Sequence, residues 1–198
     1  MMNGYFPAPE QHRTEHFLLR TYYPGDGPLL ADATNHSYEH LRPFLPWALP
    51  YQSNDDAEML VRRFRARYLT AEDFTLGIFS LNGSQLLGGT GYHLREGAGL
   101  KNQSAEIGMW IRASAARQGV GTAVLRALLR WGFTEWPWER LSWRCVARNQ
   151  ASQRTAQKAG LVQEGRLRAY ERQPDGSRDD MIYFSILREE WLAQGAEA

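Results

Sequence analysis

The chain has 198 residues, of which 43% are hydrophobic, and its formal net charge is +1 when the five histidines are neutral. This length suits one α/β domain with its own core, and this composition excludes a wholly disordered chain. The small net charge also excludes the strongly basic surface of a dedicated nucleic-acid-binding protein, so we expect no direct nucleic-acid partner.

The cysteine and histidine content narrows the classes further. Cys145 is the single cysteine, which excludes an intramolecular disulfide and a cysteine-based metal site. His36 and His40 lie four residues apart in a predicted helix, but without the acidic residue of a metalloprotease motif, so we expect no metal. Residues 1–10 lack a signal-peptide pattern, and no apolar run approaches the roughly 20 residues that span a bilayer. We therefore expect a cytoplasmic protein without a membrane partner.

The first fifty residues are predicted to contain one strand and one helix. Residues 1–12 are expected to form a flexible extension of a single domain that covers the whole chain. Alternation around Phe17 and Leu19 predicts a strand over residues 14–22. A short helix is expected over residues 29–41, followed by a stiff aromatic loop over residues 43–47, because each proline there fixes its φ.

The rest of the chain is predicted to contain six strands and three further helices. Ser53 is expected to cap a helix that runs to residue 69. Helical spacing of apolar residues predicts a second helix that begins near Val120, and a third runs from Asn149 to Gly160. Asn82-Gly83 and residues 174–176 have the composition of hairpin turns. Strands are predicted over residues 74–80, 86–92, 105–111, 141–146, 161–172 and 180–187. This order predicts a mixed α/β fold.

One loop between a predicted strand and a predicted helix has the composition of an anion-binding site. Residues 116–122 read Ala-Arg-Gln-Gly-Val-Gly-Thr, and two glycines one residue apart let successive N–H groups converge on one point. The following helix adds the positive end of its dipole, and Arg112 and Arg117 add charge. The segment therefore predicts a diphosphate site, although a flexible loop before a helix would share the same composition.

Two common nucleotide-binding motifs do not match this loop. A dinucleotide fingerprint needs a third glycine where the chain has Val124, and an acid where Arg148 follows the next strand. A Walker A loop needs Gly-Lys-Ser/Thr, which is absent. Both are excluded.

Several ordered motifs together resemble the GNAT N-acetyltransferase superfamily, and within it the RimJ/RimL-type enzymes that acetylate N-termini of ribosomal proteins. The resemblance spans roughly residues 14–187. The motifs are Leu-Arg-Pro-Phe-Leu-Pro-Trp (41–47), Ala-Glu-Ile-Gly-Met-Trp-Ile (105–111), Gly-Val-Gly (119–121), Arg-Asn-Gln-Ala-Ser (148–152), Ala-Gly-Leu (159–161) and Glu-Gly (164–165). The resemblance implies a mostly antiparallel central sheet, splayed between two parallel strands and flanked by helices.

The resemblance also implies where acetyl-CoA, the co-substrate, would bind. The pantetheine arm would lie in the splay against the backbone of Met109, Trp110 and Ile111, and Asn149 and Ser152 would contact the cofactor. The diphosphate would lie on the backbone of Arg117, Gln118, Gly119, Val120, Gly121 and Thr122. The family usually has Gln or Arg at position 116, where this chain has Ala, so that side-chain contact is absent. Relatives often pair as homodimers.

The catalytic residues that the resemblance implies are Ser152 as acid and Glu171 as base. A tyrosine serves as the acid in many relatives, but the matching position here is Ala156. Glu106, on a central strand, could instead relay a proton through water. Each of the three has a structural alternative, which is a place in the first turn of a helix for Ser152, a solvated strand position for Glu171 and a salt bridge for Glu106. Cys145 is expected inside a strand, so we expect the amine to attack the thioester directly.

The acceptor amine cannot be read from these motifs. An α-amine is roughly 15% neutral at pH 7 and a lysine amine about 0.04%, so a base matters roughly 400-fold more for lysine. The first hypothesis is a protein N-terminus, and the second is a small amine such as an aminoglycoside, a polyamine or an amino acid. A third is a coenzyme A-binding module without turnover.

Overall fold

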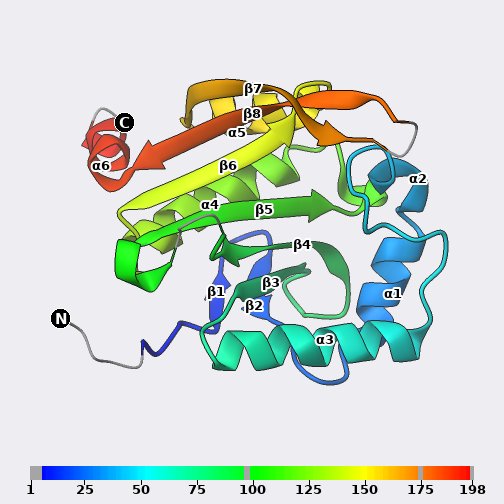
Figure 1. Cartoon of the computed structure of the whole chain (residues 1–198). Helices are drawn as coiled ribbons and strands as arrows, with labels where there is room; N and C mark the ends of the chain where they lie inside the picture. The colour runs from blue at the N-terminus through cyan, green and yellow to red at the C-terminus, as the bar shows by residue number, and fades with distance from the viewer. Residues whose placement is uncertain (1–5, 96–98, 174–175, 197–198) are drawn as a thin grey trace.

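A central sheet of eight strands with helices on both faces organises the described part of the molecule (Figure 1). The computed structural model describes residues 6–95, 99–173 and 176–196. The strands are β1 (Gln11–Arg13), β2 (Leu18–Thr21), β3 (Phe74–Phe79), β4 (Leu86–His93), β5 (Ser104–Ile111), β6 (Arg140–Val146), β7 (Val162–Arg172) and β8 (Arg178–Leu187). The helices are α1 (Gly27–Asn35), α2 (Tyr38–Leu41), α3 (Asn54–Leu69), α4 (Val120–Thr134), α5 (Gln150–Lys158) and α6 (Arg188–Ala196). This is the predicted mixed α/β fold.

The sheet is split at its only parallel pair of described strands. The strand order is β1-β2-β3-β4-β5-β6-β8-β7, and β5 and β6 are the parallel neighbours. Their register covers only Ser104–Arg140, Ala105–Leu141 and Glu106–Ser142. Beyond this point β5 continues to Ile111 and β6 to Val146 without pairing to each other, and the two strands diverge in Figure 1. The splay that the resemblance implied is therefore present.

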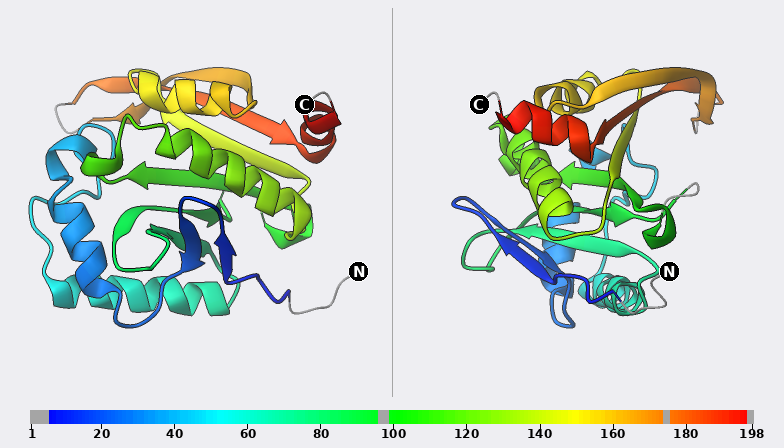
Figure 2. Two further views of the ribbon diagram at one scale, coloured as in Figure 1. Left: turned by 180° about the vertical axis from the view of Figure 1, so that it is seen from behind. Right: turned by 90° about the vertical axis from the view of Figure 1, so that its left-hand side faces the viewer.

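Alternating side chains of the strands bury a separate apolar cluster on each face of the sheet. On one face, Leu125 and Leu128 of α4 pack with Leu76 and Ile78 of β3. On the other face, helices α1 and α3 pack against Phe79 and other buried strand residues. The rear view in Figure 2 shows α4 lying across β5 and β6. Because α4 is anchored by this core, its N-terminus is held in a fixed place beside the split.

Three of the seven tryptophans form an aromatic cluster inside the core. Trp131, Trp136 and Trp138 are buried, and the rings of the last two stack 5.8 Å apart. Tyr92 contacts the same cluster and donates its hydroxyl proton to the carbonyl of Leu128 over 2.6 Å. The aromatic content of the sequence thus serves the core as well as the cavities described below.

The predicted helix over residues 29–41 is wrong as a single element. α1 ends at Asn35, and Ser37 interrupts the helix before α2 begins. The hydroxyl oxygen of Ser37 is buried and accepts the N–H of Ala113, in the loop after β5. This tertiary contact breaks the helix, so His36 and His40 do not share one helical face.

The N-terminal prediction also needs correction. Residues 14–22 are not one strand, because Thr14 accepts the N–H of Phe17 and closes a turn between β1 and β2. Residues 6–12 are not a free extension, since Tyr68 donates to the carbonyl of Pro9 over 2.7 Å and Arg65 pairs with Glu10 over 2.8 Å.

The turn predicted at residues 174–176 lies mostly outside the described residues. Asn82-Gly83 does form a turn, with Gly83 at a φ of +73°. None of the described helices is both long enough and apolar enough to cross a lipid bilayer.

Candidate functional site

The split between β5 and β6 opens into a cavity of about 860 Å³, here called the larger cavity. Its walls come from the unpaired half of β5, from β6, from the N-terminal turns of α4 and α5, and from the loop after α2. The predicted site residues that line it are Glu106, Met109, Trp110, Ile111, Arg117, Gly119, Gly121, Thr122, Asn149, Ser152 and Glu171. Gln118 and Val120 are in the same loop, but they do not line the cavity.

The free edge of β5 presents main-chain groups to the larger cavity. The N–H of Arg112 donates to the carbonyl of Leu87 over 2.8 Å, which fixes the phase of the antiparallel ladder between β4 and β5. Because hydrogen bonds alternate along such a ladder, Gly108 and Trp110 face β4, whereas Met109 and Ile111 direct their N–H and C=O toward β6. Since β6 has diverged there, these groups are available to a ligand.

The loop before α4 presents a second set of unused donors. Arg117 and Gly119 have positive φ values of 61° and 81°, and Gly119 is the N-cap of α4. In the described structure, no protein acceptor is bonded to the main-chain N–H groups of residues 117–122, and the first bond of the helix runs from Ala123 to Gly119. A Cβ on Gly119 would meet no atom within 4 Å, so the space above it is open. This is the geometry of an anion cradle at a helix N-terminus.

Positive side chains surround this cradle, although not the ones expected from sequence alone. Arg117 lines the larger cavity together with Arg154 and Lys158 of α5, and none of the three forms an ion pair with a described residue. Arg112 is directed elsewhere, because it is buried and pairs with Asp32 of α1 over 2.6 Å. The sequence-based assignment of Arg112 to the cradle is therefore wrong.

The start of α5 places a hydroxyl group at the wall of the larger cavity. Asn149 caps the helix by accepting the N–H of Ser152 over 3.1 Å. The indole N–H of Trp143 donates to the hydroxyl oxygen of Ser152 over 3.0 Å. Since an indole can only donate, this bond does not use the hydroxyl proton of Ser152, which can be donated to a sulfur atom nearby. Burial raises the pKa of the neighbouring Cys145 thiol, more than its hydrogen bond with Ser152 lowers it.

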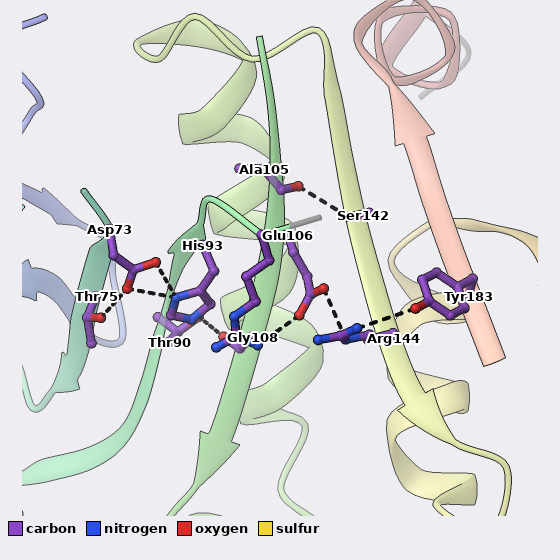
Figure 3. A network of polar contacts seen from close by, with 11 residues as sticks. Asp73, Thr75, Thr90, His93, Ala105, Glu106, Gly108, Ser142, Arg144 and Tyr183 are labelled. Carbon is purple, nitrogen blue, oxygen red and sulfur yellow. Dashed lines mark hydrogen bonds and ion pairs between the residues drawn. The ribbon is translucent and has the colours of Figure 1, made fainter. Parts of the chain in front are cut away.

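Glu106 is held by two arginines. Its carboxylate lies 3.1 Å from Arg95 and 3.1 Å from Arg144, and Arg144 also donates to the hydroxyl of Tyr183 (Figure 3). Each carboxylate oxygen is engaged by a different arginine, so neither oxygen is left free for an acceptor amine. This geometry favours the salt-bridge alternative for Glu106.

Glu171 reaches the larger cavity from β7. The register between β7 and β8 shifts between Leu167 and Glu171, where Ala169 has a positive φ of 51°. This bulge brings the half-buried Glu171 to the cavity wall. Tyr170, next to it, is 43% exposed and does not line the cavity.

A smaller cavity of about 530 Å³ adjoins the larger one. The two share a set of wall residues, so they meet along β5 beneath the loop after α2. The shared residues are Leu45, Trp47, Arg95, Gly108, Met109 and Trp110. Trp47 and Trp110 contact each other edge to face, with centroids 6.0 Å apart. Tyr51, which follows this loop, is 73% exposed and lines neither cavity.

The smaller cavity contains a histidine–carboxylate pair that the sequence analysis missed. Nδ1 of His93 lies 3.0 Å from each carboxylate oxygen of Asp73, and Thr75 donates to the same carboxylate over 2.8 Å (Figure 3). The pair could have been found from the predicted hairpin of β3 and β4. Phe74 pairs with Tyr92, so Asp73, before β3, lies beside His93, which ends β4. Register, rather than composition, brings the two together.

The described residues contain no group of three or more His, Cys, Asp or Glu side chains that could hold a metal ion.

Comparison with known proteins gives consistent matches. The family model described as "Acetyltransferase (GNAT) domain" matches residues 16–162. "Putative ribosomal N-acetyltransferase YdaF" of Bacillus subtilis is 27% identical over 180 residues, which are 89% of this chain and 94% of that protein.

Solved structures share the fold. RimL, a ribosomal L7/L12 alpha-N-protein acetyltransferase in complex with coenzyme A, superposes with a TM-score of 0.78 at 21% identity, over 88% of this chain and 95% of that one. The microcin C7 self-immunity acetyltransferase MccE, in complex with acetyl-CoA and AMP, gives 0.75 at 18% identity, over 88% and 93%.

Proposed function

The chain belongs to the GNAT acetyltransferase family, and from this premise we propose that it transfers an acetyl group from acetyl-CoA to the N-terminal α-amine of a protein, a ribosomal protein in particular. The observation that carries the proposal is the set of unused N–H groups over residues 117–122, beside strands that separate. Together they offer one site for a diphosphate and an adjoining slot for an extended thiol ester.

The charges and shape of the larger cavity fit acetyl-CoA as a substrate. The N–H groups of the cradle and the positive end of α4 would bind the diphosphate. Arg117, Arg154 and Lys158 would add charge for the remaining phosphate. The pantetheine arm, which contains amides, would bond to the outward-facing main chain of Met109 and Ile111 in the split.

The same residues supply the groups that acyl transfer needs. The N–H of Met109 points into the split, where it can stabilise the negative oxygen of the tetrahedral intermediate. The hydroxyl of Ser152, with its oxygen held by Trp143, can donate a proton to the departing sulfur. Cys145 is buried and its pKa is raised, so it stays a neutral thiol and a poor nucleophile. Direct attack by the amine follows.

The acceptor assignment rests on charge and on relatives. YdaF and RimL are named as acting on ribosomal proteins. Aminoglycosides and polyamines carry several positive charges, whereas both cavities have more arginine and lysine than carboxylate side chains. Such a lining repels polycations, and an acceptor with a single amine therefore fits better than a small polycation.

An acceptor screen tests the proposal. Purified protein with acetyl-CoA is offered peptide pools in which every amino acid occurs at the first position, and the free thiol of coenzyme A is recorded. The matched control is the same pool with its α-amines already acetylated. We expect thiol release and a mass gain of one acetyl group with the free pool only. Release of the coenzyme A thiol with spermidine or kanamycin but not with peptides would show that the acceptor is a small amine. Binding of acetyl-CoA without release for any amine would leave a non-catalytic module.

A further inference from the structure

We propose that His93, oriented by Asp73, is the general base that accepts a proton from the acceptor amine, and that the smaller cavity is the site where this amine binds. The inference rests on the proposed acetyl transfer. It assigns a role to a buried pair that neither the sequence motifs nor the family resemblance singled out.

His93 and Asp73 line the smaller cavity, which adjoins the larger one. The smaller cavity meets the larger one at Gly108, Met109 and Trp110. Met109 directs its N–H into the split, where the thioester carbonyl would lie. An amine that enters through the smaller cavity therefore arrives beside the carbonyl carbon, on the side away from the diphosphate cradle.

The second step concerns the free nitrogen of the ring. An ionised carboxylate only accepts, so Nδ1–H of His93 donates the hydrogen bond to Asp73, and in this tautomer Nε2 carries the lone pair. Nε2 has no hydrogen-bond partner among the described residues. A Cβ built on Gly108 would lie 3.0 Å from Nε2. The free nitrogen is therefore next to the strand segment where the two cavities meet, and glycine at position 108 leaves room for the ring.

The third step concerns the charge of the carboxylate. Burial raises the pKa of Asp73, but the hydrogen bond and charge of His93, the hydrogen bond from Thr75 and the charge of Arg67 lower it by more, so the net pKa is below its usual value. Asp73 is therefore ionised at neutral pH and can stabilise an imidazolium. The pair has the base–orienter arrangement of acyl-transfer enzymes.

The fourth step excludes competing bases on this side. Two arginines hold Glu106, which lies opposite His93 in the register of β4 and β5. Glu171 lines only the larger cavity. The other charged groups that face His93 are Arg67 of α3 and Arg95, which follows β4, and both are cations. In the described lining of the smaller cavity, His93 is the group that combines a lone pair without a hydrogen-bond partner with a carboxylate to orient it.

Nε2 of His93 accepts one proton from the ammonium, which gives the neutral amine and an imidazolium paired with Asp73. The amine nitrogen forms a bond to the thioester carbonyl carbon. As the C–S bond breaks, Ser152 gives its hydroxyl proton to the coenzyme A sulfur. The second proton of the nitrogen then restores the hydroxyl of Ser152. The products are an amide and a free thiol, and His93 returns its proton to water.

The test compares two acceptors that differ in the basicity of the terminal nitrogen. One is a peptide pool with glycine, and hence a free α-amine, at its first position. The other is the same pool with azaglycine at that position, whose terminal nitrogen is neutral throughout the assay range. His93→Gln is expected to lower kcat/KM by about 100-fold or more for the α-amine pool, the usual size of a general-base effect, and by far less for the azaglycine pool. Asp73→Asn should show the same selectivity with a smaller loss.

A matched control is available in the first strand. His12 is a half-buried histidine that stacks on Trp131 and lies 3.9 Å from Glu135, away from both cavities. His12→Gln should leave the ratio between the two acceptors as it is in the wild type. The affinity for acetyl-CoA, measured by calorimetry, should be the same for all variants, because His93 does not line the larger cavity.

The outcomes separate the two proposals. A selective loss with α-amines supports the role of His93. An equal loss with both acceptors, or no loss, shows that His93 is structural while acetyl transfer stands. A wild type that binds acetyl-CoA but releases no thiol with either pool overturns the proposed function, and this role with it.

Discussion

Substituting Gly119 with valine tests the cradle directly, because the chain offers a control of the same kind. Gly119 has a φ of +81° and Gly83 a φ of +73°, and a Cβ on either glycine would meet no atom within 4 Å. A valine in this left-handed region costs roughly 1–2 kcal/mol at either position. The folding penalty should therefore be similar for Gly119→Val and Gly83→Val. Only the first change disturbs the donors that face the larger cavity.

The expected loss of affinity follows from those donors. To relieve its strain, the backbone at position 119 must turn, which redirects at least one N–H group, and the new side chain fills the open space where the diphosphate would approach. A hydrogen bond to a charged group contributes about 1.5–3 kcal/mol. Since 1.4 kcal/mol is a factor of ten, Gly119→Val should raise the Kd for acetyl-CoA about 10- to 150-fold.

Calorimetric titration with two ligands makes the test specific. S-acetylpantetheine lacks the diphosphate, so it should bind Gly119→Val as it binds the wild type. Gly83→Val should bind both ligands as the wild type does. If Gly119→Val and Gly83→Val lose the same affinity, or if S-acetylpantetheine is weakened as much as acetyl-CoA, then residues 117–122 do not hold the diphosphate and the central assignment is wrong.

Three further predictions concern catalysis and stability. Ser152→Ala should lower kcat about 100-fold or more while leaving the Kd for acetyl-CoA nearly unchanged, and an unaltered kcat would remove this hydroxyl from the reaction. Leu128→Ala, at a fully buried position of α4, should reduce the free energy of unfolding in urea by about 2–5 kcal/mol, and a loss below about 1 kcal/mol would contradict the packing described. The pKa of Glu10 is below its usual value because Arg65 donates a hydrogen bond to it, against the opposing effect of burial. Its contribution to stability is therefore present above about pH 4.3 and is lost as pH falls through the lowered pKa, so the stability difference between wild type and Glu10→Gln should shrink on acidification and not at neutral pH.

Local signals were sufficient for the elements that hold the cradle. The Gly-Val-Gly run of residues 119–121 comes between a strand with alternating apolar residues and a helix with apolar residues at helical spacing. All of these can be read within a window of some thirty residues, and the structure has each of them. The caps Ser53 and Asn149 were read equally well, because each bonds to a residue three positions on.

Tertiary contacts decided the features that local patterns could not give. The break between α1 and α2 depends on Ser37, whose partner Ala113 is distant in sequence. Arg112 was assigned to the cradle by proximity in the chain, yet its partner Asp32 belongs to α1. The short strand β1 and the helix α6 were not predicted, since three residues and a weakly amphipathic segment carry little periodicity.

Strand β5 connects the two halves of the reaction that we propose. The alternation of the β4–β5 ladder turns the main-chain groups of its odd-numbered residues from Ile107 onward toward the split, and these groups stay unpaired because β6 diverges after Glu106. Its even-numbered Gly108 lies under the ring of His93. Glycine leaves room for the ring there, because a side chain at this position would press against Nε2. One strand can thus hold the thioester on its free edge and admit a base within one residue of it. The separation of β5 from β6 is therefore the structural condition both for binding the donor and for bringing the acceptor within reach of its carbonyl.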